Sequence, residues 1–108
     1  MKRDPKILEE VKATLAELVR RAPGRAIEVR IPPYAAIQFG EGPAHTRGTP
    51  PNVIEMDADT WLALANGQES WNVAMRRGAI NASGTRADLS EYLPIFENRI
   101  AQDRKSTR

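Results

Sequence analysis

The chain has no cysteine and only one histidine, and these absences exclude several kinds of chemistry. Without cysteine it has no disulfide, no thiolate metal site and no cysteine nucleophile. A single histidine also argues against zinc, whose sites draw several ligands from histidine and cysteine. The fold must therefore be held together by packing, which fits a reducing compartment. We expect a cytoplasmic protein that needs no metal and no cofactor.

The chain also lacks a long apolar run. No segment approaches the roughly 18 apolar residues that span a bilayer. The opening sequence MKRDPKILEE has no apolar stretch of the kind found in signal peptides. We therefore expect no stable membrane insertion.

Neither sign of charge is in large excess, since the formal net charge is only +2 over 108 residues. A basic tail, residues 99–108, carries four basic side chains against the single acid Asp103. Because no aromatic residues lie between these charges, the tail is a weak signal for nucleic acid, and we expect no such partner. With 41% hydrophobic and 28% charged residues, the composition is that of one folded domain spanning 1–108.

Residues 4–22 have the pattern of an amphipathic N-terminal helix. Asp4 followed by Pro5 suits a helix cap and its first turn. Apolar residues recur with the spacing that forms one helical face, at Leu8, Val11, Leu15 and Leu18.

Four short segments are typical of strands: 25–31, 34–39, 53–56 and 79–83. The first alternates with period two, which predicts one apolar and one polar face. In the second, alternation puts Ile37 and Phe39 on one face. In the fourth, we expect Ile80 and Ala82 on opposite faces.

The stretch from Asp57 to Phe96 is punctuated by glycines and predicts three further helices. Asp57 or Asp59 is expected to cap the first and Ser70 the second, with Gly67 and Gly78 closing them. Thr85 and Asp88 resemble a capping box, which predicts a third helix from near Arg86, kinked or restarted at Pro94.

The same stretch resembles a known family. Its order of Asp-Thr-Trp-Leu-x-Leu-x-x-Gly, Trp-x-x-Ala-x-x-x-Gly-x-Ile-x-x-x-Gly and Asp-Leu-x-x-Tyr-Leu-Pro is similar to the C-terminal half of the sterol carrier protein-2 family. The upstream run PGRAIEVRIPPYAAIQFGEGPAHTRGTPPNVIEMD, and above all its HTRGTPPN block, resembles the small actinobacterial "sterol carrier family protein" branch. The resemblance covers residues 23–96.

This resemblance implies an α/β domain of the α+β type, with a mostly antiparallel sheet of four to five strands and helices packed on one face. It also implies an apolar cavity for lipid-like ligands: a fatty acid, an acyl-CoA or a sterol-like molecule. We expect the cavity between the sheet and the tryptophan-bearing helices, lined by Ile27, Val29, Ile37, Phe39, Trp61, Leu64, Trp71, Met75 and Leu93.

The polar loop from Gly40 to Asn52 holds the densest cluster of functional groups. Loops of this length inside a domain are usually functional or disordered. The arginine fork suits an anionic head group, so we expect head-group contacts from His45, Thr46, Arg47 and Thr49. The alternative is a loop held by its own hydrogen bonds, with Arg47 paired to Glu41 or Glu55.

The sequence shows no recognisable set of catalytic residues, because no serine lies in a nucleophile motif beside a base and an orienting acid. We therefore expect no catalysis, and the resemblance implies a carrier or binding module. Aromatic residues at helical spacing are also what an ordinary core contains. The alternative function is a ligand-free interaction or scaffold domain that packs on a partner protein or forms a homodimer.

Overall fold

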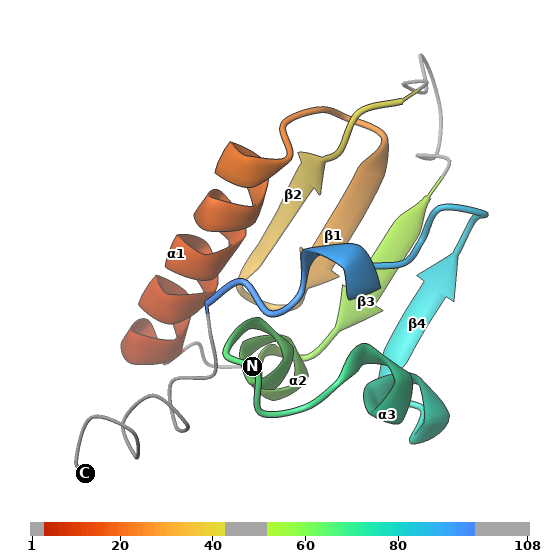
Figure 1. Ribbon diagram of the computed structural model, residues 1–108. Coiled ribbons are helices and arrows are strands. Elements are labelled where there is room, and N and C mark those ends of the chain that lie inside the picture. Colours follow the sequence, from red (N-terminus) through yellow and green to blue (C-terminus); the bar gives the residue numbers. More distant parts are fainter. Residues whose placement is uncertain (1–3, 43–51, 97–108) are drawn as a thin grey trace, which may run out of the picture.

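The protein is built around a four-stranded sheet, seen in a computed structural model that describes residues 4–42 and 52–96 (Figure 1). The strand order is β2-β1-β3-β4, with β1 antiparallel to β2, parallel to β3, and β3 antiparallel to β4. The elements in chain order are α1 (Pro5–Arg21), β1 (Ile27–Ile31), β2 (Ala35–Phe39), β3 (Val53–Met56), α2 (Ala58–Ala65), α3 (Trp71–Arg76), β4 (Ile80–Ser83) and the 3₁₀ turn η1 (Ser90–Tyr92).

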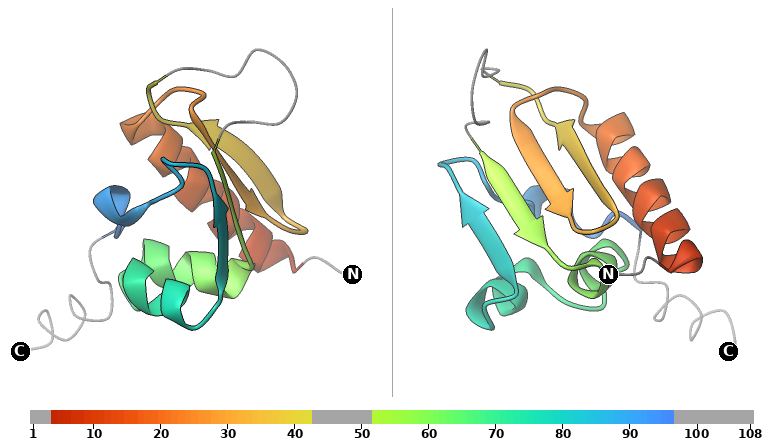
Figure 2. Two further views of the ribbon diagram at one scale, coloured as in Figure 1. Left: turned by 90° about the vertical axis from the view of Figure 1, so that its right-hand side faces the viewer. Right: turned by 180° about the vertical axis from the view of Figure 1, so that it is seen from behind.

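One face of the sheet is covered and the other is bare. Figure 2 shows α2, α3 and the segment that carries η1 on the same side of the strands, whereas no described helix lies across the opposite face. Helix α1 runs beside β2 and contacts both β2 and α2. The expected α+β fold, a mostly antiparallel sheet with helices on one face, is confirmed.

The strand register explains which residues point toward the helices. Ile27 lies opposite Phe39 and Val29 opposite Ile37, so the inward face of β1 and β2 is apolar, as predicted. The prediction for β4 was wrong. Met56 pairs with Ile80 and Ile54 with Ala82, so both β4 residues share the covered face, as period-two alternation requires.

The predicted N-terminal helix is confirmed together with its cap. The Asp4 carboxylate accepts from the backbone N–H groups of Lys6 at 2.8 Å and Ile7 at 3.4 Å, and Pro5 occupies the first turn. The apolar stripe buries Val11, Leu15 and Leu18 against the rest of the core.

A single polar contact joins α1 to α2 inside the core. Trp61 is fully buried, and its Nε1 donates to Thr14 Oγ1 at 2.7 Å. The Thr14 hydroxyl has carbonyl acceptors within its own helix, with Glu10 O at 2.8 Å and Val11 O at 3.0 Å. The largest core side chain therefore has its one donor satisfied by the helix on which it packs.

The predicted third helix is absent from the described residues, and the proposed Thr85–Asp88 capping box is not formed. Asp88 Oδ1 instead accepts from Ser90 N at 2.7 Å, a local turn that competes with helix formation. Residues 85–96, here called the strap, cross the covered face with only the short η1 turn. Burial of Leu89 and Ile95, at 0% and 1% exposure, holds this irregular path in place.

Replacing Thr14→Val should destabilise the protein, because it removes the acceptor of a buried donor while nearly preserving volume. We expect a loss of about 1–3 kcal/mol in the free energy of unfolding, measured by urea denaturation. Thr14→Ser keeps the hydroxyl and removes one methyl group, so it should cost less. A larger loss for Thr14→Ser than for Thr14→Val would show that packing, and not the hydrogen bond, dominates.

Candidate functional site

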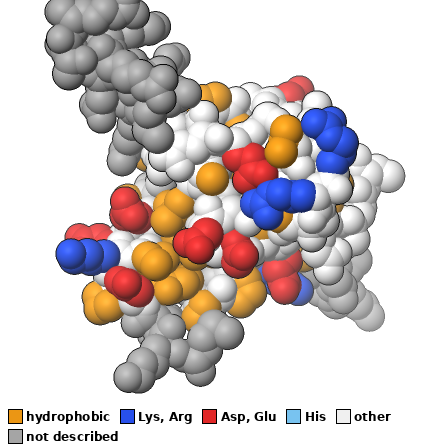
Figure 3. Space-filling view, turned by 90° about the horizontal axis from the view of Figure 1, so that it is seen from below, with side chains coloured by type: hydrophobic (Ala, Val, Ile, Leu, Met, Phe, Trp, Pro, Cys, Tyr) orange, Lys and Arg blue, Asp and Glu red, His pale blue; other side chains and the backbone are white. Residues whose placement is uncertain are grey.

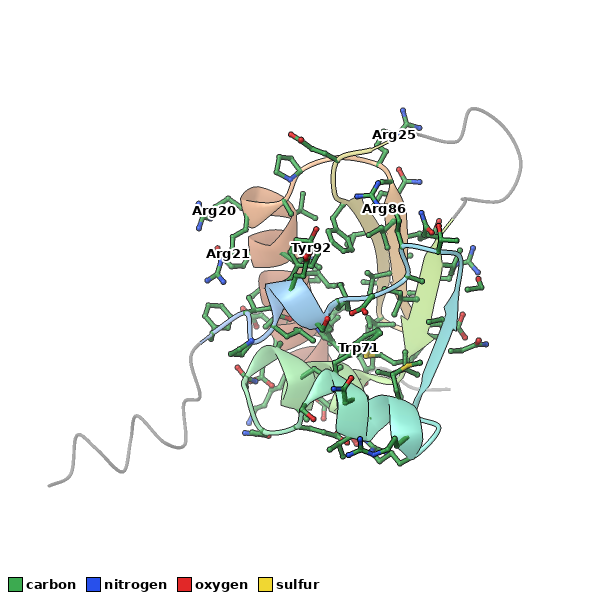
Figure 4. The ribbon with its side chains drawn as sticks, turned by 45° about the vertical axis from the view of Figure 1, so that its right-hand side comes forward. Arg20, Arg21, Arg25, Trp71, Arg86 and Tyr92 are labelled. Atoms are coloured by element: carbon green, nitrogen blue, oxygen red, sulfur yellow. The ribbon has the colours of Figure 1, made fainter. Side chains whose placement is uncertain are left out.

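A cavity of about 400 Å³ lies where α2 and α3 meet the strap, and we call it the groove. Figure 4 shows the Trp71 side chain between α3 and η1. The residues that line the groove are Leu64, Gly67, Gln68, Glu69, Ser70, Trp71, Asn72, Ser90, Leu93 and Pro94.

One wall of the groove is the tight connection between α2 and α3. Gly67 ends α2 with a φ of +76°, a backbone conformation that glycine adopts at little cost. The N–H groups of Gln68 and Glu69 then both donate to Ala63 O, at 2.8 and 3.2 Å. Ser70 caps α3 by accepting from Val73 N at 3.2 Å, as predicted. These bonds hold the three polar residues that precede Trp71 along the groove.

The opposite wall is the strap, which is fastened at both of its ends. Near its start, Arg86 N donates to the buried Asn52 Oδ1 at 2.8 Å. Near its end, Phe96 N donates to Ala65 O at 2.9 Å, which ties the strap to α2. Between them the Tyr92 ring stands edge-on to Phe39, with ring centroids 5.2 Å apart.

One ion pair dominates the electrostatics of the groove. Arg77 donates to both carboxylate oxygens of Glu69, from Nε at 2.6 Å and from Nη2 at 2.9 Å. Hydrogen bonds from Arg77 lower the pKa of Glu69 below its ordinary value, and the same bonds raise the pKa of Arg77. Among the described residues that line the groove, none is lysine, arginine or histidine.

The structure divides the predicted pocket residues into three groups. Leu64, Trp71 and Leu93 come together in the groove. Met75 is 41% exposed and does not line it, and Ile37 is half-buried. The others are buried within the packed core, namely Ile27, Val29, Phe39 and Trp61, and Ile27 also lines a separate hollow beside the strap.

The predicted head-group residues His45, Thr46, Arg47 and Thr49 lie outside the described residues, as does the basic tail, residues 99–108. Sequence reasoning missed Gln68, Asn72 and Ser90, which line the groove. For Gln68 a signal was available, because it lies in a short polar connection between two apolar helices, where binding residues are frequent.

Two further hollows differ from the groove in the charged side chains that line them. One of about 480 Å³ lies at the bare side of the sheet around Tyr34, between Arg30 and Glu55. Another of about 360 Å³ lies beside the strap, with Arg86, Asp88 and Glu91 among its lining residues. Both place charged side chains of opposite sign at the opening, whereas the groove combines an indole with leucines and mostly neutral polar groups.

Within residues 4–42 and 52–96, no three acidic or histidine side chains come close enough together to hold a metal ion. No helix in these ranges has the length and apolar character needed to cross a bilayer.

The comparison with known families agrees with this architecture. A family model described as bacterial SCP ortholog matches residues 3–95, which include every helix and strand that the structure describes. The chain belongs to the bacterial SCP ortholog family. The match confirms the resemblance noted from the sequence and extends it over α1, so the SCP-type fold here includes the N-terminal helix. No curated protein is significantly similar to the chain.

The pKa of Glu69 should respond to the removal of Arg77. In the intact protein this pKa lies below 4.5, so the pair's contribution to stability is present above pH 4.5 and is lost as pH falls through the lowered value. Arg77→Leu should raise the pKa of Glu69 toward 4.5 and weaken this acid sensitivity.

Carboxyl NMR titration measures this change and contains its own control. Glu17, whose pKa is about 2 because of hydrogen bonds from Arg20 and Arg21, should not change in Arg77→Leu. An unchanged pKa for Glu69 in that variant would contradict the assignment of the shift to Arg77.

Proposed function

We propose that the protein is a non-catalytic binding or carrier module for a lipid-like molecule, and that the groove receives the apolar part of that ligand. The observation that carries the proposal is the meeting of Leu64, Trp71 and Leu93 around a cavity of about 400 Å³. Ligand pockets are typically about 300–1,000 Å³, lined by apolar and aromatic side chains with a few polar groups. Membership of the bacterial SCP ortholog family supports the same proposal.

The size of the groove favours a single alkyl chain or a compact ring system. Each methylene that leaves water contributes about 0.8 kcal/mol. Lengthening an alkyl ligand by two carbons should therefore strengthen binding roughly tenfold, until the chain exceeds the groove. The fatty acid, acyl-CoA and sterol-like classes all contain such an apolar part.

Filling the groove should weaken ligand binding without disturbing the core. Ser90 is exposed and lines the groove, so Ser90→Trp places an indole in the space that the ligand would occupy. We expect at least a tenfold weaker affinity for n-alkyl ligands, followed by the chemical shift of the Trp71 indole N–H. The matched control is Asn81→Trp on the bare face of the sheet, which should bind as the unchanged protein does. Equal binding by both variants would place the ligand elsewhere.

The alternative function, a scaffold domain that dimerises or packs on a partner, is favoured by a separate observation. Val73 and Met75 on α3 are 43% and 41% exposed, the large hydrophobic residues most open to solvent among those described. Figure 3 views the molecule from below, the side on which Figure 1 places α2 and α3, and shows hydrophobic side chains interspersed with acidic ones. An interface that covers either side chain would remove exposed apolar surface from water.

This alternative predicts self-association through α3. The mass measured by light scattering should then be that of a dimer, and Val73→Arg should return it to that of a monomer, because a buried unpaired charge disrupts an apolar contact. The groove is not altered by this substitution, so alkyl binding should persist. A monomeric mass for the unchanged protein at high concentration would eliminate the dimer.

A further inference from the structure

The polar groups around the groove are almost all neutral. Gln68, Asn72 and Ser90 are exposed at its rim, and their side chains make no hydrogen bond to other described residues. Amide and hydroxyl groups can each donate and accept hydrogen bonds. They can therefore bond to an uncharged head group that is a donor, an acceptor or both.

The one charged residue of the lining does not favour an ionic ligand. Glu69 is negative, and its two oxygens are already engaged by Arg77, which does not itself line the groove. The lowered pKa of Glu69 keeps this carboxylate ionised at neutral pH. Because Arg77 offsets the charge of Glu69, the pair presents little net charge to the groove and favours neither an anionic nor a cationic head group.

We infer that the groove selects an uncharged amphiphile, with a single apolar part and a hydroxyl, amide or ester head group, over carboxylates, phosphates and amines of the same chain length. The inference rests on the proposed function, since it concerns the ligand of the same groove. A carboxylate that enters the groove loses hydration, and the described lining holds no cation to offset that loss. An alcohol or primary amide loses less hydration and can bond to Gln68, Asn72 or Ser90.

A matched ligand series tests this selection. The full chain is titrated at neutral pH with decan-1-ol, decanamide, decanoate and decylamine, with Trp71 indole shifts and calorimetry as readouts. We expect the alcohol and the amide to bind at least tenfold more tightly than the carboxylate and the amine. Decanoate or decylamine binding as tightly as decan-1-ol would overturn the inference and leave the proposed function standing. Absence of binding by the whole series would overturn both.

A charge placed at the rim should reverse the preference. Gln68→Lys adds a cation beside the groove at an exposed position, so it should strengthen decanoate binding severalfold relative to decan-1-ol binding. The matched control, Asn81→Lys, adds the same charge on the bare sheet face and should alter neither affinity. An equal gain for decanoate in both variants would show a general charge effect and would overturn the selection by the groove.

Discussion

The hydrogen bond from Trp61 Nε1 to Thr14 Oγ1 is the contact on which the arrangement of the helices depends. A fully buried indole needs a partner for its N–H, since an unsatisfied donor in the core costs about 1–3 kcal/mol. In the position that α2 takes, the Thr14 hydroxyl meets this need. Helix α2 then carries Leu64 to the groove and presents Ala65 O to the strap, so the helix held by this buried contact takes part in both walls.

Much of the fold could be predicted from the sequence because its signals are local. The caps at Asp4, Asp57 and Ser70 each satisfy backbone N–H groups within three residues, and all three are formed. In the strap, by contrast, local sequence signals do not predict the structure. Thr85 and Asp88 have capping-box spacing, but the Asp88 carboxylate accepts from the backbone N–H of Ser90, two residues ahead, while Leu89 is fully buried. Tertiary burial outweighed a local pattern that was compatible with a helix.

The candidate site was less predictable, because a core residue and a pocket residue look alike in sequence. Val29 and Leu64 are both apolar and both face inward, yet Val29 is enclosed by the core and Leu64 borders the groove. The difference depends on where the strap passes, and that path is determined by contacts between distant segments, such as Phe96 N with Ala65 O. Spacing and composition carry no information about those contacts.

Domain size explains why the ligand space lies at the margin of the core. An internal void costs about 24 cal/mol per Å³, so an empty interior cavity of the groove's volume, about 400 Å³, would cost about 10 kcal/mol. That is comparable with the entire stability of a small domain, about 5–15 kcal/mol. In this protein Leu89 and Ile95 are buried in the interior, and the groove lies at its margin, where an irregular strap meets two short helices. A groove between such elements meets solvent when it is empty, so it avoids the cost of a dry cavity while still offering Trp71 and Leu93 to an apolar ligand.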